Sequence, residues 1–195
     1  MKSTDNDIIR RVLDGDHRAY AELIDRHKDK AMTLSMRMLK NRHDAEEALQ
    51  DAFVRAFRAL PSFEWKSSFS TWFYRIVFNV CSSALSRRGQ TNLLSIDEEN
   101  DDDLKIEIPS TDEEPDREYE KKEFLQIVHG EIERMDASYS SILTMFFLQE
   151  MSYDEIIVVT GLPIGTVKNR LFRARLQLRN AVARHFTDMD QMVNV

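Results

Sequence analysis

The sequence lacks the cysteine pairs, the signal peptide and the long apolar runs that are typical of secreted and membrane proteins. It has one cysteine, Cys81, so no disulfide can form within the chain, and a reducing compartment fits. No apolar run approaches the length of a membrane span, and the N-terminal residues MKSTDNDIIRR have no signal-peptide core. We therefore expect a cytoplasmic protein without direct membrane insertion.

The sequence also lacks the patterns of an α/β fold and of a catalytic centre. Nowhere do strands alternate with helices, which predicts an all-α protein. Its five histidines are scattered without the spacing of metal ligands, and we expect no metal, no cofactor and no catalytic residue. His27 lies on an apolar helical stripe, and both it and Cys81 are interpreted as core residues.

A net positive charge is missing as well, since the formal charge is −7. The distribution changes this picture, because residues 92–120 alone carry −11 and the remainder of the chain carries +4. A basic protein interrupted by an acidic segment is compatible with a nucleic-acid partner.

The chain divides into two helical domains joined by a linker. Residues 5–88 form the first domain, residues 89–117 a polar, acidic and flexible linker, and residues 118–186 the second domain, with helices at 118–134, 138–150, 152–160 and 163–183. In the first domain, Tyr20 to Met38 mark one amphipathic helix, and Asp44 is expected to cap the next. The stripe of that next helix is Ala45, Ala48, Leu49, Ala52, Phe53, Ala56, Phe57 and Leu60, and Pro61 ends it. A further helix is expected from Ser70 to Ser86.

The segment 152–179 has the pattern of a helix-turn-helix. Ser152 and Glu155 form a capping box, Gly161 can end the first helix, and Pro163 can begin the second. On the second helix an apolar stripe of Val167, Leu171, Ala174 and Leu178 faces the core. Six Lys or Arg and no acidic residue occur between Pro163 and Phe186. This pattern predicts a helix that enters the major groove of DNA, although a basic hairpin with a solvated face is the alternative. The residues on its candidate DNA-binding face and flanks are Thr166, Lys168, Asn169, Arg170, Phe172 and Arg173.

Aromatic residues gather in the segment 63–78, FEWKSSFSTWFYRIVF, which holds seven of the 18 in the chain. Most of them follow apolar helical stripes and are interpreted as core. Phe63, Trp65 and Lys66 lie in a loop, where aromatic rings and a cation can stack on bases and bind phosphate, which suits single-stranded DNA or a flipped base. The alternative is that the loop is only structural. The candidate single-strand contacts are Phe63, Trp65, Lys66, Ser67, Ser68, Trp72, Arg75 and Asn79.

Three blocks in this order resemble the extracytoplasmic-function (ECF) sigma factors of the sigma-70 family. They are DAEEALQDAFVRAFRAL (44–60), SFSTWFYRIVFNV (68–80) and LPIGTVKNRLFRAR (162–175), and the resemblance covers nearly the whole chain outside the linker. It implies a subunit that directs core RNA polymerase to promoters and assists promoter opening. The loop departs from many members of the family at Trp65 and Lys66.

The resemblance also implies roles for particular residues. The helix 44–60 resembles the one that docks on the clamp helices of the β′ subunit, with Gln50 and Asp51 at its polar contact positions. The loop 63–68 and the following helix resemble the part that melts and recognises the minus-ten element, with Asn79 near a flipped base. The helix 163–178 resembles the part that recognises the minus-thirty-five element. Further implied partners are the flap of the β subunit and an anti-sigma factor, with one copy of the chain in each holoenzyme.

Two other classes of protein are alternatives to this hypothesis. An ordinary helix-turn-helix repressor or activator dimerises on paired half-sites, but the chain has no heptad helix for a dimer and its aromatic loop would be unexplained. A DNA-acting enzyme needs a nucleophile and an arginine or metal cluster, which the sequence does not present. For the acidic linker, a solvated spacer is the simpler interpretation, and mimicry of nucleic acid in the path of the polymerase is the alternative.

Overall fold

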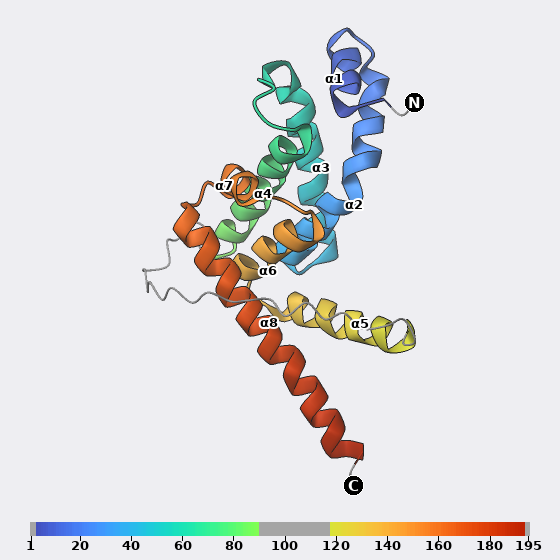
Figure 1. The fold of residues 1–195 in the computed structure, drawn as a ribbon. Coiled ribbons are helices and arrows are strands. Elements are labelled where there is room, and N and C mark those ends of the chain that lie inside the picture. The colour runs from blue at the N-terminus through green and yellow to red at the C-terminus, as the bar shows by residue number, and fades with distance from the viewer. Residues whose placement is uncertain (1–2, 90–117, 194–195) are drawn as a thin grey trace.

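The structure, a computed structural model, describes residues 3–89 and 118–193, with side chains for 3–89 and 124–185. These residues are helical, with no strand among them, which confirms the all-α prediction (Figure 1). The linker expected at 89–117 lies, apart from Gly89, outside the described residues. The helices are α1 (Asp5–Leu13), α2 (Tyr20–Leu39), α3 (Arg42–Ala59), α4 (Phe69–Arg87), α5 (Glu118–Arg134), α6 (Ala137–Leu143), α7 (Tyr153–Thr160) and α8 (Ile164–Val193).

Helix α3 begins earlier than the sequence pattern suggested. Asn41 has an extended backbone, and its side-chain oxygen accepts a hydrogen bond from the Asp44 amide at 3.1 Å, so Asn41 is the N-cap. The prediction of Asp44 as the cap was therefore wrong. Asp44 lies in the first turn, where a carboxylate also suits the helix dipole. Either residue type can occupy either place, so the sequence alone did not separate them.

The ends of α7 follow the predicted chemistry. The Ser152 hydroxyl accepts from the Glu155 amide and the Glu155 carboxylate accepts from the Ser152 amide, which completes the capping box. Gly161 ends the helix at φ 72°, in the left-handed region that glycine adopts without a steric penalty. The carbonyl of Pro163 then accepts from the Val167 amide at 3.0 Å, and α8 follows.

Aromatic rings of α3 and α4 form the centre of the N-terminal domain, residues 3–89. Phe73 is fully buried, with the Phe53 ring stacked at 4.5 Å and the Phe69 ring at 5.8 Å. The His27 ring lies 5.2 Å from Phe69, and its Nε2 pairs with Asp5 at 2.8 Å. Tyr20 reaches across from α2 and donates its hydroxyl to the Phe53 carbonyl at 2.8 Å. His27 and Tyr20 thus find partners within the domain, whereas the buried hydroxyl of Tyr74 has none.

One residue of the predicted α3 stripe does not belong to the core. Phe57 has 37% of its surface exposed, and its ring meets Tyr20 and His17 at the rim of the domain. Phe57 lies at the edge of the stripe, whereas its neighbours Ala56 and Leu60 are buried. The assignment of Phe57 to the core was therefore wrong.

The C-terminal domain, residues 118–193, packs α6, α7 and the first half of α8 together. Val167, Leu171 and Ala174 are buried and Leu178 is half-buried, so the predicted apolar face of α8 is confirmed. The expected helix 138–150 is shorter and closes with one turn of π-helix at Thr144–Leu148. Helix α8 runs to Val193 rather than to residue 183, and no glycine or proline follows Gly165 to end it.

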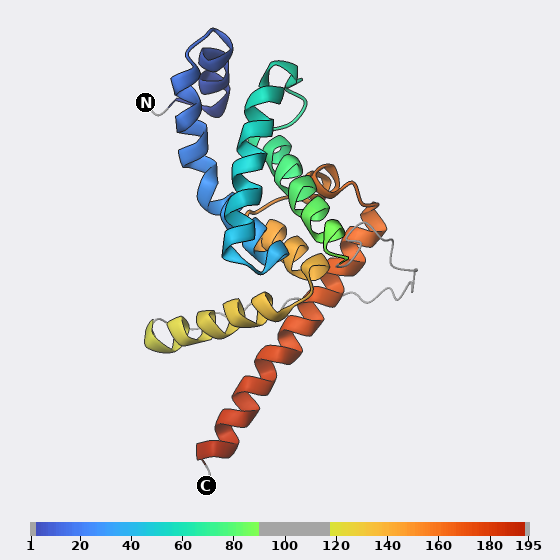
Figure 2. The same ribbon diagram turned by 180° about the vertical axis from the view of Figure 1, so that it is seen from behind.

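The two domains lie against each other. In Figures 1 and 2, α7 lies beside α4 and α6 crosses the C-terminal end of α2, while α5 and the far half of α8 extend away from the body. The Ser140 hydroxyl, fully buried, donates to the Arg37 carbonyl at 3.0 Å. The Arg37 side chain is 7% exposed and pairs with Glu133 at 3.0 Å. Buried apolar residues of both domains belong to one continuous cluster.

Candidate nucleic-acid interface

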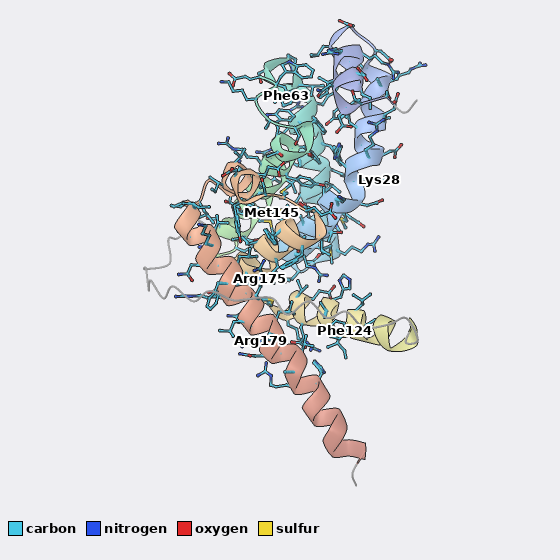
Figure 3. The ribbon with its side chains drawn as sticks, viewed as in Figure 1. Lys28, Phe63, Phe124, Met145, Arg175 and Arg179 are labelled. Carbon is cyan, nitrogen blue, oxygen red and sulfur yellow. The ribbon has the colours of Figure 1, made fainter. Side chains whose placement is uncertain are left out.

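The loop between α3 and α4 is built on a buried aromatic. Phe63 is 5% exposed and packs against Trp65, Trp72 and Phe69, with centroids at 5.0, 5.1 and 6.4 Å. Figure 3 shows its position at the end of the molecule where this loop lies. Phe63 therefore supports the loop from beneath and presents little ring surface to a base. The sequence placed it outside every helical stripe, and it packs all the same because loop residues can also cover a core.

Trp65 is the aromatic residue that the loop exposes. Its surface is 43% exposed, and its backbone has φ 59°, a conformation that is uncommon for a residue with a bulky side chain. Such backbone strain costs about 1–3 kcal/mol and occurs most often at functional sites. Phe63 supports one side of the indole, and the Arg10 guanidinium of α1 lies 5.8 Å from the ring centroid. The ring is thus held outward and near a cation.

The charges of the loop itself cancel. Lys66 pairs with Glu64 at 2.8 Å, and both side chains are well exposed. An exposed pair of this kind is worth at most about 1 kcal/mol, so a phosphate can compete for Lys66. Ser68 caps α4 by accepting from the Thr71 amide at 3.1 Å, and Ser67 is half-buried.

The remaining candidates of this segment lie along α4. Arg75 and Asn79 are exposed and one turn apart, and Trp72 is half-buried against Phe63. Together with Trp65, Lys66 and Ser68 of the loop, they offer accessible ring or polar surface. Thr71, one turn before Arg75, is only 1% exposed, because α7 packs against α4 there and Glu155 bonds its hydroxyl.

Helix α8 places the second set of candidates at unequal depths. Lys168 is exposed, while Asn169, Phe172 and Arg173 are half-buried. Thr166 is 9% exposed and Arg170 only 2%. Their depth follows from the helix geometry, since both lie directly beside the buried stripe that contains Val167 and Leu171. In this arrangement Lys168 is the candidate most open to a ligand.

Arg175 has a different environment from Arg173, although both belong to the basic run. Its guanidinium lies over the rings of Phe146 and Phe147, at 5.1 and 5.0 Å from their centroids. Phe147 is 51% exposed, so the arginine also covers apolar surface. Figure 3 shows Arg175 and Arg179 along α8. We interpret Arg175 as a structural residue of the second domain.

Of the two candidates of α3, Asp51 lines a charged cleft between α3 and α4, and Gln50 lies outside its lining. Gln50 is exposed, and Asp51 pairs with Arg55 at 2.8 Å. The cleft has a volume of about 370 Å³, and at its far end Arg88 pairs with Asp44 at 2.6 Å. The guanidinium of Arg88 is the largest cause that holds the pKa of Asp44 below its ordinary value. This surface thus presents paired charges of both signs.

Sequence reasoning missed three residues of these surfaces. Val54 and Phe57 are 47% and 37% exposed on α3, and Val54 lies one turn from Gln50. Phe57 had been included in the apolar stripe of the helix, and Val54 was not singled out by any pattern. Arg10 was missed because it lies 55 positions before Trp65, and no local pattern joins the two.

Among the described residues, no group of His, Cys, Asp and Glu is arranged to hold a metal ion. No described helix is long and apolar enough to cross a membrane. Cys81 is fully buried, and burial raises the pKa of its thiol to about 11. These residues define a helical protein with a helix-turn-helix and a separate exposed aromatic loop. Both features are typical of DNA-binding proteins.

Comparison with known proteins identifies the family within this class. Residues 23–91 match the family model for Sigma-70 region 2, and residues 125–178 match the one for Sigma-70, region 4. The ECF RNA polymerase sigma-E factor of Haemophilus influenzae is 31% identical over 183 residues, which is 92% of this chain and 95% of that protein. The sigma-E factor of Escherichia coli is 34% identical over 186 residues, with 92% and 94% covered.

Solved structures agree on the fold. CnrH in complex with the cytosolic domain of CnrY has a TM-score of 0.62 at 21% identity, over 91% of this chain and 96% of that one. The sigma factor RpoE of Bartonella quintana, in complex with the anti-sigma factor NepR, has a TM-score of 0.60 at 21% identity, over 84% and 96%. The chain belongs to the ECF group of RNA polymerase sigma factors of the sigma-70 family.

Proposed function

We propose that this sigma factor recognises a promoter with two separate surfaces of its two domains. The exposed Trp65, held outward by Phe63, is the observation that carries the assignment of the minus-ten surface. Base stacking on an aromatic ring is worth about 1–3 kcal/mol, more than the roughly 0.5–1 kcal/mol of an exposed cation–π contact. A base of the melted strand can therefore displace Arg10 from the ring. Lys66, Arg75 and Asn79 supply polar contacts around it.

The minus-thirty-five surface is assigned to Lys168, Asn169, Phe172 and Arg173 of α8. Lys168 meets the backbone phosphates, and Asn169 and Arg173 meet base edges in the major groove. Thr166 and Arg170 are assigned to the flanks of this surface. Because Arg170 is buried, its main role is to orient the helix. Residues 5–88 and 118–186 are then the two promoter-binding domains.

The polymerase surface is assigned to Gln50 and Asp51, with Val54 and Phe57 added from the structure. Exposed apolar side chains beside polar ones are typical of a protein-binding surface. We place the clamp helices of the β′ subunit on this face of α3, and the flap of the β subunit on the second domain. The chain works as one copy per holoenzyme in the cytoplasm and leaves the chemistry to the polymerase, without an enzymatic activity of its own.

An anti-sigma factor is proposed as a further partner. Two solved relatives of the same fold, CnrH and RpoE, are seen in complexes, and the partner of RpoE is described as an anti-sigma factor.

Transcription in vitro tests the proposal. Core bacterial RNA polymerase is incubated with and without the protein on a library of promoter fragments, and the start sites are sequenced. The expected result is specific initiation that depends on the protein and defines both elements. Duplex affinity without polymerase binding or initiation would contradict it.

Single variants test the residue assignments within that assay. Asn169→Ala or Arg173→Ala should weaken discrimination at the upstream element by about 1–3 kcal/mol and leave polymerase affinity intact. Equal losses on all promoters would contradict base recognition at these positions. Trp65→Ala should impair opening more than binding of closed duplex, and normal opening would make the loop structural.

A further inference from the structure

We infer that Arg10 of α1 belongs to the single-strand surface and binds the phosphate next to the base that stacks on Trp65. This inference rests on the proposed role of the loop. It adds a DNA contact from α1, a helix to which neither the sequence nor the family comparison assigned a role in DNA binding. In the free protein the Arg10 guanidinium lies 5.8 Å from the centroid of the Trp65 ring.

The charges around the loop favour Arg10 for this role. Lys66, the nearest cation in the loop, is paired with Glu64 at 2.8 Å. Arg10 has its carboxylate neighbour, Asp7, at the longer distance of 3.7 Å, and its side chain is 68% exposed. The other oxygen of Asp7, Oδ2, accepts from the Thr4 amide at 2.9 Å and from the Thr4 hydroxyl, so this carboxylate also caps α1. The arginine is thus held near the ring and open to solvent.

The backbone fixes this placement. Asp7 and Thr4 form the capping box of α1, which sets the direction of the last turn that carries Arg10. On the other side, Phe63 and the left-handed backbone of Trp65 hold the indole outward. A base that stacks on the indole displaces the guanidinium from the ring by no more than the width of a base. The planar guanidinium then meets the phosphate oxygens of the same nucleotide or of its neighbour.

The test compares Arg10→Ala and Arg10→Lys with a matched control, Arg18→Ala. Arg18 is an exposed arginine in the short turn His17–Ala19 that follows α1. Holoenzymes of each variant bind a fork-junction probe, whose single strand carries the minus-ten element, over a range of salt concentrations. A lost phosphate contact lowers the slope of log affinity against log salt by about 0.7 for a single strand.

The expected result is a lower slope and about tenfold weaker probe binding for Arg10→Ala, a near-normal slope for Arg10→Lys, which keeps the charge, and no change for Arg18→Ala. Affinity for an upstream duplex without the fork should be unchanged in all three variants. Equal slopes for Arg10→Ala and Arg18→Ala would overturn the inference. A melting curve of each free variant shows whether Arg10 only supports the loop, since that role would lower stability without changing the slope.

Trp65→Ala is measured together with the Arg10 variants. Its result distinguishes a failure of the Arg10 assignment from a failure of the proposed role of the loop. If Trp65→Ala impairs the fork probe and Arg10→Ala does not, the assignment of Arg10 is wrong and the loop assignment stands. If neither variant affects the fork probe, both are wrong.

Discussion

Thr71 and Glu155, 84 positions apart, share a hydrogen bond of 2.9 Å between the helix of the candidate minus-ten surface and the first helix of the helix-turn-helix. Glu155 has two tasks, since its carboxylate also accepts from the Ser152 amide as half of the α7 capping box. These bonds favour the ionised form, and the Ser152 amide is the largest cause that lowers the pKa of Glu155. One carboxylate therefore stabilises a helix and joins two domains.

The two tasks of Glu155 can be separated by substitution. Thr71→Val should lower the free energy of unfolding by about 1.5–3 kcal/mol, the usual value for a hydrogen bond to a charged group. Glu155→Ala should cost about 1 kcal/mol more, because it also removes the cap. Denaturant titrations of the two single variants and the double variant measure this. Equal losses for both single variants would show that the cap contributes nothing.

Asp5 gives a pH dependence of known sign. Its hydrogen bond with His27 is the largest cause that lowers the pKa of the Asp5 carboxyl, and Arg26 adds to it. A carboxyl with a lowered pKa in the folded state contributes stability that is complete above its ordinary value of 3.8 and is lost as pH falls through the folded-state pKa. Asp5→Asn should therefore reduce stability at neutral pH and flatten its decline in acid, as measured by thermal melting from pH 7 to pH 2. The same slope in both proteins would refute this.

Cys81 should be unreactive in the folded protein. Its side chain is fully buried, and the pKa of the thiol is raised to about 11, so little thiolate exists at neutral pH. We expect a disulfide reagent at pH 8 to label it only at the rate of unfolding and at once in denaturant. Fast labelling of the native protein would show that the α4 core opens locally.

Arg173 and Arg175 should behave differently despite their shared charge. Arg175→Ala removes the cation above Phe146 and Phe147 and should lower the free energy of unfolding by about 0.5–2 kcal/mol with no change in promoter discrimination. Parallel melting and promoter competition assays test the pair. Lost discrimination in Arg175→Ala would place that residue on the DNA instead.

The sequence was sufficient where a local rule governs the structure. The capping box of Ser152 and Glu155, the end of α7 at Gly161 and the apolar face of Val167 and Leu171 each depend on residues less than two helical turns apart. Within such a stretch, hydrogen-bond valence and helical period leave few alternatives. The assignment of the all-helical class followed from the same local patterns.

It was insufficient where distant segments meet. Phe63 reads as a free loop residue until Trp72 and Phe69 are placed around it, and Phe57 reads as core until its stripe is followed around α3. The interdomain contacts of Arg37 and the position of Arg10 over Trp65 join residues that no periodicity connects. The roles proposed for the surface residues stay predictions until promoters and polymerase are tested.

The continuous apolar cluster that spans both domains has a consequence for how this chain unfolds. When two folded units share buried surface, the loss of one exposes part of the core of the other, and the energetic penalty couples their stabilities. The free chain should therefore lose both domains in one cooperative transition, although its family divides it into two regions. Binding that separates the domains would convert that single transition into two.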